Sequence, residues 1–432
     1  MIEKTPIALS KEYQYALDTL EKTTQNCFIT GRAGTGKSTL LKLFRDTTKK
    51  KVIVLAPTGV AALNVKGQTI HSFFGFPAKP IGPEDIRRRK NRKLFEKMEV
   101  LIIDEISMVR ADMLDNMDYS LRINRNRNIP FGGVQVVFFG DLFQLPPVVA
   151  TMEEHQLFKT HFESPYFFSA KVFEDHNFEM ENIELNTTYR QESRHFIRLL
   201  DAVRTNQIDY DDLEDLNERH FPEFESEDYY ITLCSRNATA DQINQRQLAR
   251  LQTEPFEYRA RVTGNFNPRL FPTELDLALK LGSQVMFVKN DPQRRFVNGT
   301  IGKVVSLDED KVNVSIQKDD GTTKMLTLEK MEWEILKYKN NETDASKIDS
   351  NVVGTFTQYP VKLAWAITIH KSQGKTFDRI IVDLGKGAFE HGQTYVALSR
   401  CRTLEGVVLK QRLQGKDIMV DDRIVEFYEQ NF

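Results

Sequence analysis

Residues 27–39 have the types and the spacing that bind a polyphosphate. They read CFITGRAGTGKST, in which a short apolar run enters a glycine-rich turn and an apolar helix is predicted to follow. Gly31, Gly36, Lys37 and Ser38 fit the pattern G-x-x-x-x-G-K-[ST] in its usual strand–loop–helix setting. Backbone N–H groups of such a loop surround a phosphate, and the helix N-terminus adds its positive dipole. A chance Gly/Lys turn is the alternative, which the flanking strand and helix disfavour.

Roles within this loop follow from phosphoryl chemistry. Lys37 is expected to reach the outer phosphates, and the Ser38 hydroxyl is expected to hold Mg²⁺. The residues predicted to contact the nucleotide are Gly31, Arg32, Ala33, Gly34, Thr35, Gly36, Lys37, Ser38 and Thr39.

Acidic and amide side chains follow two further apolar runs. Asp104 and Glu105 end the run 100–103, and sheets of α/β proteins bind ligands at the carboxyl ends of their strands. Asp104 suits a water-mediated Mg²⁺ contact, and Glu105 is positioned to polarise the attacking water. Gln144, in GDLFQLPP, is expected to sense the terminal phosphate. A solvated acidic pair and a surface glutamine are the alternatives.

Two arginines in the second half of the chain are candidates for stabilising the transferred phosphoryl group. Arg190 lies in TTYRQ and Arg400 in ALSR. An arginine placed where charge develops contributes about 10³–10⁵ in rate. If the two halves of the chain face each other, both side chains reach the phosphates. Ordinary ion pairing is the alternative.

Polar and aromatic residues in both halves are candidates for nucleic-acid contacts, since hydroxyls and amides hold phosphates and aromatic rings stack on bases. For Phe73, a place in the apolar core is an equally good interpretation. A basic run at 87–93 has six positive side chains in seven positions. It favours a backbone-contact patch or strand-separating element over a solvated face. A weaker patch is predicted at Arg122, Arg125 and Arg127. The DNA-contact candidates are Thr58, Asn64, His71, Phe73, His370, Lys371 and Ser372.

Alternating apolar runs and helical segments show how these residues are positioned. Continuous apolar strands separated by helices favour a parallel sheet covered on both faces. Residues 1–180 are predicted to form one nucleotide-binding α/β domain. Residues 255–350 instead show short alternating strands and turn signals, which predict a small β-barrel or hairpin module. The α/β fold class therefore has a second domain, residues 181–254 and 351–432, interrupted by that β insertion.

Composition limits the other classes of protein. A hydrophobic content of 40% with 28% charged residues is ordinary for a soluble chain, and no apolar run approaches the roughly 18 residues of a membrane span. The net charge of −2 means that any nucleic-acid binding comes from local patches. Three dispersed cysteines indicate a reduced intracellular protein without structural zinc. Met1–Pro6 is neither a secretory signal nor a transit sequence, so no membrane partner and no targeting are expected.

The order of these motifs resembles that of superfamily-one DNA helicases. EISM at 105–108 and FGG at 131–133 are similar to the petite-integration-frequency (PIF) family, and the resemblance covers almost the whole chain. One departure concerns the family's adenine-contacting glutamine, which directly follows Leu-Ser-x-Glu. Here Tyr13 intervenes, and a slip of one residue assigns the role to Gln14. The motifs that carry the resemblance are 31–39, 56–63, 102–108, 140–147, 189–190, 368–374 and 395–400.

This resemblance implies two RecA-like domains, an SH3-like insertion at 255–350 and a small wedge, which we place at about 70–98. It implies ATP and Mg²⁺ as cofactors, with Gly374 among the nucleotide contacts. It also implies 5′-to-3′ movement on single-stranded DNA and unwinding of duplexes, forks, DNA–RNA hybrids and G-quadruplexes in replication, repair, recombination and telomere maintenance. We expect a minimal bacterial-type core, cytoplasmic or nucleoid, acting as a monomer or a DNA-induced dimer.

Two other functions remain open at this point. One is a P-loop switch or clamp that binds DNA without translocating, and the other is a helicase directed to RNA. A small-molecule kinase would leave the second α/β unit and the pair Arg190 and Arg400 unexplained.

Overall fold

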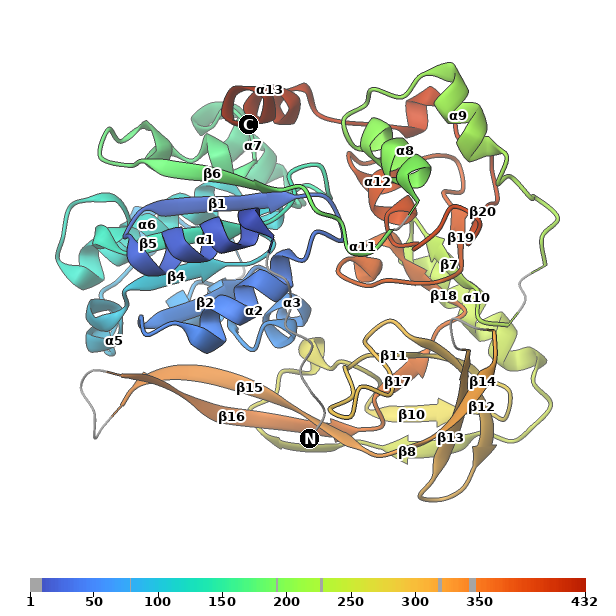
Figure 1. Ribbon diagram of the computed structural model, residues 1–432. Helices are drawn as coiled ribbons and strands as arrows, with labels where there is room; N and C mark the ends of the chain where they lie inside the picture. The colour runs from blue at the N-terminus through green and yellow to red at the C-terminus, as the bar shows by residue number, and fades with distance from the viewer. Residues whose placement is uncertain (1–9, 78, 192, 226–227, 318–320, 342–346) are drawn as a thin grey trace.

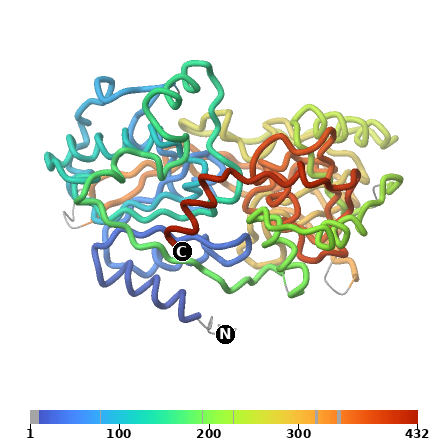
Figure 2. The backbone as a smooth tube through the Cα atoms, turned by 90° about the horizontal axis from the view of Figure 1, so that it is seen from above, coloured from blue at the N-terminus to red at the C-terminus, as the bar shows by residue number. Residues whose placement is uncertain are grey.

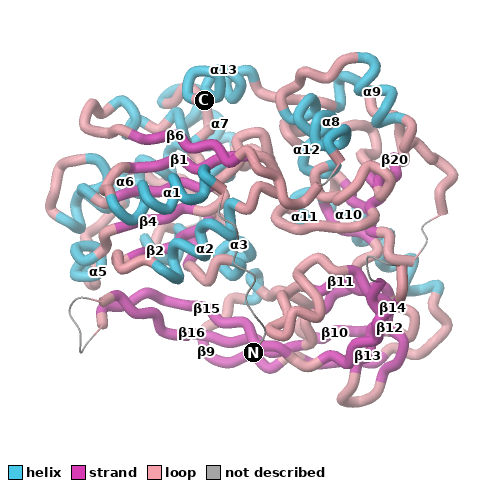
Figure 3. The backbone as a smooth tube through the Cα atoms, in the orientation of Figure 1, coloured by secondary structure: helices cyan, strands magenta, loops and turns pink. Residues whose placement is uncertain are grey.

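The computed structural model describes residues 10–432 apart from residues 78, 192, 226–227, 318–320 and 342–346, so the Met1–Pro6 stretch lies outside the described residues. Figure 1 shows two sheet-and-helix units side by side and a β-rich unit beneath them. Figure 3 shows that strands dominate only in the lower unit. Among the described residues no helix has the length and apolar character needed to span a bilayer.

The first unit is built on a six-stranded sheet in the order β3-β2-β4-β5-β1-β6, and all its strand pairs are parallel. The apolar runs predicted as buried strands form its centre. The sheet also takes in residues 180–185, which pair with β1, so the first unit extends beyond the predicted boundary at 180. Its strands are β1 (Asn26–Gly31), β2 (Val52–Ala56), β3 (Gln68–Thr69), β4 (Val100–Ile103), β5 (Gln135–Phe139) and β6 (Met180–Leu185).

Helices cover this sheet. The first helix begins where predicted, because the Ser10 side chain accepts a hydrogen bond from the Tyr13 N–H at 3.3 Å. The helices of the unit are α1 (Lys11–Lys22), α2 (Lys37–Thr47), α3 (Gly59–Asn64), α4 (Ile70–Phe74), α5 (Arg92–Lys97), α6 (Ala111–Arg125) and α7 (Met152–His161).

The second unit has a four-stranded parallel sheet in the order β18-β7-β19-β20. Both parallel sheets place the carboxyl ends of their strands where loops and helix N-termini carry the motifs. Its strands are β7 (Ile231–Cys234), β18 (Ala366–Thr368), β19 (Ile380–Asp383) and β20 (Val407–Leu409). Its helices are α8 (Arg194–Arg204), α9 (Tyr210–Asn217), α10 (Asn237–Arg250), α11 (Ile369–Ser372) and α12 (Gln393–Leu398).

The β-rich unit is antiparallel. It extends past the predicted end at residue 350, because the strand Val361–Leu363 pairs with β11 in this unit. An apolar run alone cannot distinguish a strand of a parallel sheet from one of an antiparallel sheet. The strands are β8 (Phe256–Arg259), β9 (Arg261–Gly264), β10 (Asp276–Leu279), β11 (Gln284–Phe287), β12 (Ile301–Leu307), β13 (Val312–Gln317), β14 (Thr323–Leu328), β15 (Met331–Asn340), β16 (Ile348–Gln358) and β17 (Val361–Leu363).

Two segments cross from one unit to another. The hairpin of β15 and β16 runs beneath the first unit, where the Tyr338 hydroxyl accepts from the Val54 N–H at 3.1 Å. The last helix, α13 (Asp422–Asn431), returns to the first unit, as Figures 1 and 2 show. There the ring of Phe427 stacks on Phe168 with centroids 4.4 Å apart. Although α13 was predicted as part of the second domain, its side chains pack on the first.

Candidate functional site

The phosphate loop joins β1 to α2, as predicted. Gly34 has φ of +90°, and a Cβ there would lie 2.6 Å from Arg190 Cβ, so only glycine fits this turn. The Lys37 ammonium donates to the carbonyls of Gly31 at 2.5 Å and Arg32 at 3.0 Å. Burial lowers the pKa of Lys37 to about 8. Lys37 is thus held by the loop that it is expected to leave when a polyphosphate enters.

The acidic pair lies at the carboxyl end of β4, beside this loop. Asp104 is buried, and Glu105 has φ of +53°, a left-handed conformation that is uncommon for a residue with a side chain. Burial raises the pKa of both carboxyl groups, and the charge of Glu105 raises that of Asp104 further. The charge of Lys37 lowers the pKa of each. A bound cation would favour the ionised form of both.

The two candidate arginines lie together on the side of the site that the second unit forms. Arg190 donates to the Ser399 carbonyl at 2.9 Å. Arg400 is 1% exposed and donates to the Val396 carbonyl at 2.9 Å. Burial lowers the pKa of both guanidinium groups, that of Arg190 to about 9, and their mutual repulsion adds to this for Arg190. Among the described residues neither has a carboxylate oxygen within 4.0 Å. Arg400 is buried and Arg190 is half-buried, and two neighbouring cations without a carboxylate partner favour an anionic ligand between them and the phosphate loop.

Direct hydrogen bonds join the first unit to the second at this site. The Tyr395 hydroxyl of α12 accepts from the Ala33 N–H at 2.9 Å and donates to Asp141 Oδ2 at 3.1 Å. Arg204 of α8 donates to Asp141 Oδ1 at 3.3 Å, and its guanidinium lies 4.3 Å from the Phe143 ring centroid. Sequence reasoning missed these three polar residues. Asp141 and Tyr395 carried a signal, because they belong to the motifs at 140–147 and 395–400, whereas Arg204 belongs to no motif.

Gln144 lies between the two units. It is buried, its amide donates to Asp141 Oδ2 at 3.4 Å, and its carbonyl oxygen accepts from Gln373 Nε2 at 3.5 Å. Gln373 follows α11 in the second unit, so Gln144 touches both halves of the chain. This position suits the predicted phosphate sensor, whose role stays a prediction.

The other side of the loop carries two tyrosines. Tyr13 is buried and donates to the Thr35 carbonyl at 3.0 Å, and its ring meets Tyr189 edge-on with centroids 6.2 Å apart. Tyr189 is 57% exposed, which leaves a face for a flat ligand beside the loop. Gln14 is exposed and donates to Asp18 at 3.0 Å, because successive helical residues point about 100° apart. The structure brings Tyr13, not Gln14, to the loop.

Ser38 and Thr39 are exposed at the start of α2, where the loop N–H groups also lie. Arg32 instead pairs with Asp201 of α8 at 2.7 Å. Gly374, after α11, is exposed, with φ of +71° and open space at its Cβ position.

The DNA-contact candidates of the first unit divide into surface and core. The Thr58 hydroxyl caps α3, Asn64 is exposed at the end of that helix, and His71 is half-buried on α4. Phe73 is 6% exposed and packs against Phe95 with ring centroids 5.2 Å apart. The core interpretation of Phe73 therefore holds here, and the predicted base contact has no exposed ring to make it.

In the second unit, His370 and Lys371 lie at the surface on α11, and His370 Nε2 is 3.1 Å from Glu390 Oε2. Ser372 is buried and its hydroxyl donates to the Ile369 carbonyl at 2.6 Å, so its side chain is turned away from solvent. Lys371 is exposed and His370 is half-buried, and both belong to the first turn of this short helix.

The basic run 87–93 is exposed throughout. The weaker patch is not formed as predicted. Arg122 pairs with Asp118 at 2.8 Å, and Arg125 donates to the Gly132 carbonyl at 2.8 Å. Only Arg127 of the three is exposed. The guanidinium groups of Arg122 and Arg125 are bound by nearby carboxylate and carbonyl oxygens. The sequence alone does not show such pairings.

Comparison with known proteins gives consistent matches. Residues 8–214 match the model of the family described as PIF1-like helicase. The chain is 35% identical to the ATP-dependent DNA helicase Pif1 of Bdellovibrio bacteriovorus, over 98% of this chain and 92% of that protein. It is 32% identical to human ATP-dependent DNA helicase PIF1, over 94% of this chain but 61% of that protein.

Solved structures of Pif1 helicases fall into two groups by their TM-scores to this chain. The unliganded Pif1 from Bacteroides sp. (39% identity) and the Bacteroides sp. Pif1 complex with ADP-AlF4 (38%) match with TM-scores of 0.88 and 0.89. The same protein bound to ssDNA, and the structure of two coordinating Pif1 helicases at forked dsDNA, match with TM-scores of 0.69 at 38% identity. Each covers 98% of this chain and 97% of the matched chain.

Proposed function

The chain belongs to the PIF1-like helicase family, and on that premise we propose how it works as an ATP-dependent DNA helicase. ATP is hydrolysed in the seam between two RecA-like domains, and the opening and closing of that seam moves the protein along single-stranded DNA. The observation that carries the proposal is the pair Arg190 and Arg400. Arg190 lies beside Gly34 of the phosphate loop, the charge of Arg400 acts on Glu105, and the described residues offer neither arginine a carboxylate oxygen within 4.0 Å.

ATP binds with its phosphates in the loop 31–39. Lys37 leaves the carbonyls of its own loop for the outer phosphates. Their negative charge stabilises the protonated form of Lys37, which burial disfavours. Glu105 polarises the attacking water, and Gln144 contacts the terminal phosphate. Arg190 and Arg400 stabilise the charge that develops during transfer, and Tyr189 supplies a flat surface for the adenine. Since these groups come from both domains, hydrolysis requires the seam to be closed.

A magnesium ion fits the residues at the loop. The Asp104 carboxylate and the Ser38 hydroxyl are oxygen donors of the kind that Mg²⁺ prefers, and Asp104 is a buried carboxyl group that a cation would stabilise in its ionised form. When bound, the ion neutralises charge on the phosphate oxygens. Asp104, through water, and Ser38 are the residues that would hold it.

We propose that the DNA track crosses both domains. Thr58, Asn64 and His71 lie on the first, and His370 and Lys371 lie on the second. Closure shifts the grip between these two sets while each base-pair step resists with about 1.4 kcal/mol of stacking. The direction of movement is 5′ to 3′, and substrates include forked duplexes, DNA–RNA hybrids and G-quadruplexes. Segment 70–98 acts as the wedge, and the β-rich unit is the SH3-like insertion.

Strand displacement on duplexes with a single 5′ or 3′ tail tests this function. With ATP and Mg²⁺, we expect the 5′-tailed duplex to be unwound and the 3′-tailed duplex to remain paired. ATP hydrolysis should rise with single-stranded DNA and fall steeply with salt, because the contacts are to phosphates. A clamp would displace neither strand, and an RNA-directed helicase would prefer an RNA tail in competition.

DNA binding is expected to release the β15–β16 hairpin from the first unit. The chain has the arrangement of the DNA-free Bacteroides structures, with TM-scores of 0.88 and 0.89 against 0.69 for those with DNA. In this arrangement Asn340 Nδ2 donates to Asn91 Oδ1 at 2.8 Å. A disulfide between Asn91→Cys and Asn340→Cys should therefore suppress DNA-stimulated hydrolysis and unwinding, and reductant should restore both.

The three native cysteines are buried, so oxidation should be confined to the introduced pair. Each single cysteine variant, oxidised in the same way, is the control and should keep full activity. Unwinding at the wild-type rate by the cross-linked protein would show that the hairpin need not move.

A further inference from the structure

Phe389 is an exposed aromatic residue on the loop 384–392, which follows β19. It is 54% exposed. Strands β18, β7 and β19 are neighbours in a parallel sheet, so this loop leaves the same edge of the sheet as α11. The next residue, Glu390, lies 3.1 Å from His370. Phe389 is therefore adjacent to the residues that we place on the DNA track.

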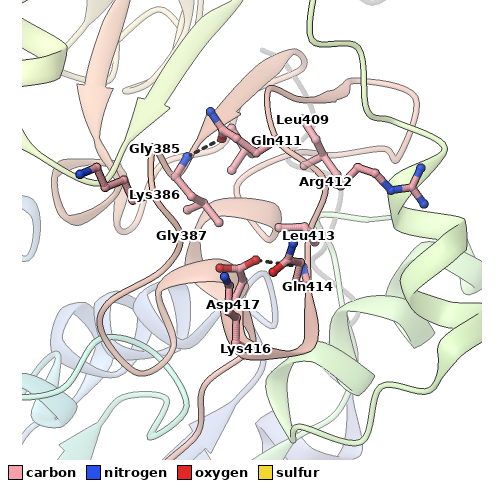
Figure 4. Close-up of a pocket in the computed structure, with 12 residues that line it drawn as sticks. Gly385, Lys386, Gly387, Leu409, Gln411, Arg412, Leu413, Gln414, Lys416 and Asp417 are labelled. Carbon is pink, nitrogen blue, oxygen red and sulfur yellow. Dashed lines mark hydrogen bonds between the residues drawn. The ribbon is translucent and has the colours of Figure 1, made fainter.

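Hydrogen bonds to residues 411 and 417 hold the loop 384–392 in place. Gln411 Oε1 accepts from the Leu384 N–H, and Asp417 Oδ1 accepts from the Ala388 N–H, both at 3.2 Å. Figure 4 shows residues 385–387 facing residues 409–417 across a cavity of about 150 Å³. Lys386 and Arg412 point away from that cavity in opposite directions. We therefore look for a binding surface on the loop itself, which carries Phe389, and not in the cavity.

The far end of the loop meets the phosphate sensor. Gly392 has φ of +70°, and a Cβ there would lie 2.4 Å from the Phe143 carbonyl oxygen and 2.6 Å from that of Gln144. Gln393, the next residue, is fully buried, and its side-chain oxygen accepts from the Phe389 N–H at 3.2 Å. One short segment thus connects the exposed ring to the loop that carries Gln144.

We propose that Phe389 is a stacking platform for one base of single-stranded DNA on the second domain. This inference rests on the proposed function. Aromatic stacking tolerates any base, as a motor on arbitrary sequence requires, and complements the phosphate contacts of His370 and Lys371. Because the loop continues to Gly392, a base on Phe389 also bears on the position of Gln144, and DNA occupancy is communicated to the nucleotide site.

Equilibrium binding of fluorescein-labelled oligodeoxythymidine across a salt series tests this proposal. Phe389→Ala should weaken binding by about 5- to 150-fold, the range for one stacked base, without changing the slope of log Kd against log salt concentration. Phe389→Trp should retain the wild-type affinity. Lys371→Ala should instead reduce the slope, because it removes a phosphate contact. Tyr210→Ala, an exposed aromatic residue on α9, is the matched control and should bind as wild type.

The outcomes separate this inference from the proposed function. If wild-type protein hydrolyses ATP in response to DNA and Phe389→Ala binds with unchanged affinity, only the platform is overturned. A changed salt slope for Phe389→Ala, or failure of Phe389→Trp to bind, would also overturn it. An effect confined to association between protein molecules, seen by sedimentation, would make Phe389 a protein contact. If wild-type protein neither binds the oligonucleotide nor responds to DNA, both proposals are wrong.

Discussion

Arg400→Ala is expected to lower DNA-stimulated ATP hydrolysis by about 10³- to 10⁵-fold, the contribution of an arginine that stabilises the transferred phosphoryl group. Arg400 is 1% exposed, and among the described residues its guanidinium donates hydrogen bonds to the Val396 carbonyl and the Ser399 hydroxyl and to no carboxylate. Its charge is therefore available to a ligand. Since the contact strengthens as charge develops, kcat should fall far more than KM for ATP rises.

Steady-state hydrolysis and equilibrium binding of a fluorescent ATP analogue measure this difference. Arg190→Ala, on the same side of the site, should reproduce the loss of kcat, and it guards against a folding defect specific to α12. Arg412→Ala is the control, because this guanidinium pairs with Glu214 at 2.7 Å on the surface. A variant of Arg400 that folds, as judged by its melting temperature, and keeps kcat within tenfold of wild type would exclude the catalytic role.

Lys37→Ala should abolish hydrolysis and unwinding while leaving DNA binding. Lys37 donates hydrogen bonds to the Gly31 and Arg32 carbonyls, and none of the proposed DNA contacts depends on it. Oligodeoxythymidine affinity should therefore stay within a few-fold of wild type. The loss should appear as failure to hydrolyse even at saturating ATP and DNA.

The protonation of Lys37 gives this prediction a second readout. Burial holds its pKa at about 8 in the free protein, below the ordinary value of 10.5. Phosphates raise it, so above pH 8 ATP binding should take up a proton and weaken as the pH rises. Calorimetry in buffers of different ionisation enthalpy measures this uptake, which Lys37→Ala should lack. Normal unwinding by that variant would contradict the assignment of the phosphate loop.

Local patterns predicted the elements that position the site. The G-x-x-x-x-G-K-[ST] loop, the carboxylates after β4 and the glutamine after β5 lie where strand ends in a parallel sheet must place them. Arg190 and Arg400 were candidates because phosphoryl transfer needs cations and both lie in motifs of the second half of the chain. The structure places Arg190 beside Gly34 of the loop and joins it to the Ser399 carbonyl, next to Arg400, and the catalytic role of both stays a prediction.

Contacts between distant segments could not be predicted in the same way. The Tyr395 hydroxyl reaches the Ala33 N–H across 362 positions of sequence, and no local pattern records that pairing. Phe73 packs against Phe95 and also against the hairpin residue Tyr338, with ring centroids 5.2 Å and 6.2 Å apart. Helix α13 packs on the first domain because its apolar face meets Phe168 there. Gln14 follows Tyr13 by one residue in α1, and this single step along the helix turns its side chain toward solvent.

A structure of this protein with ADP, aluminium fluoride and single-stranded DNA tests the central claim most directly. The seam account predicts that the guanidinium groups of Arg190 and Arg400 leave the Ser399 and Val396 carbonyls and lie about 3 Å from the fluoride ligands that replace the transferred phosphoryl group. If both guanidinium groups stay on those carbonyls, out of reach of the nucleotide with and without DNA, the two units do not form one catalytic site and the account is wrong.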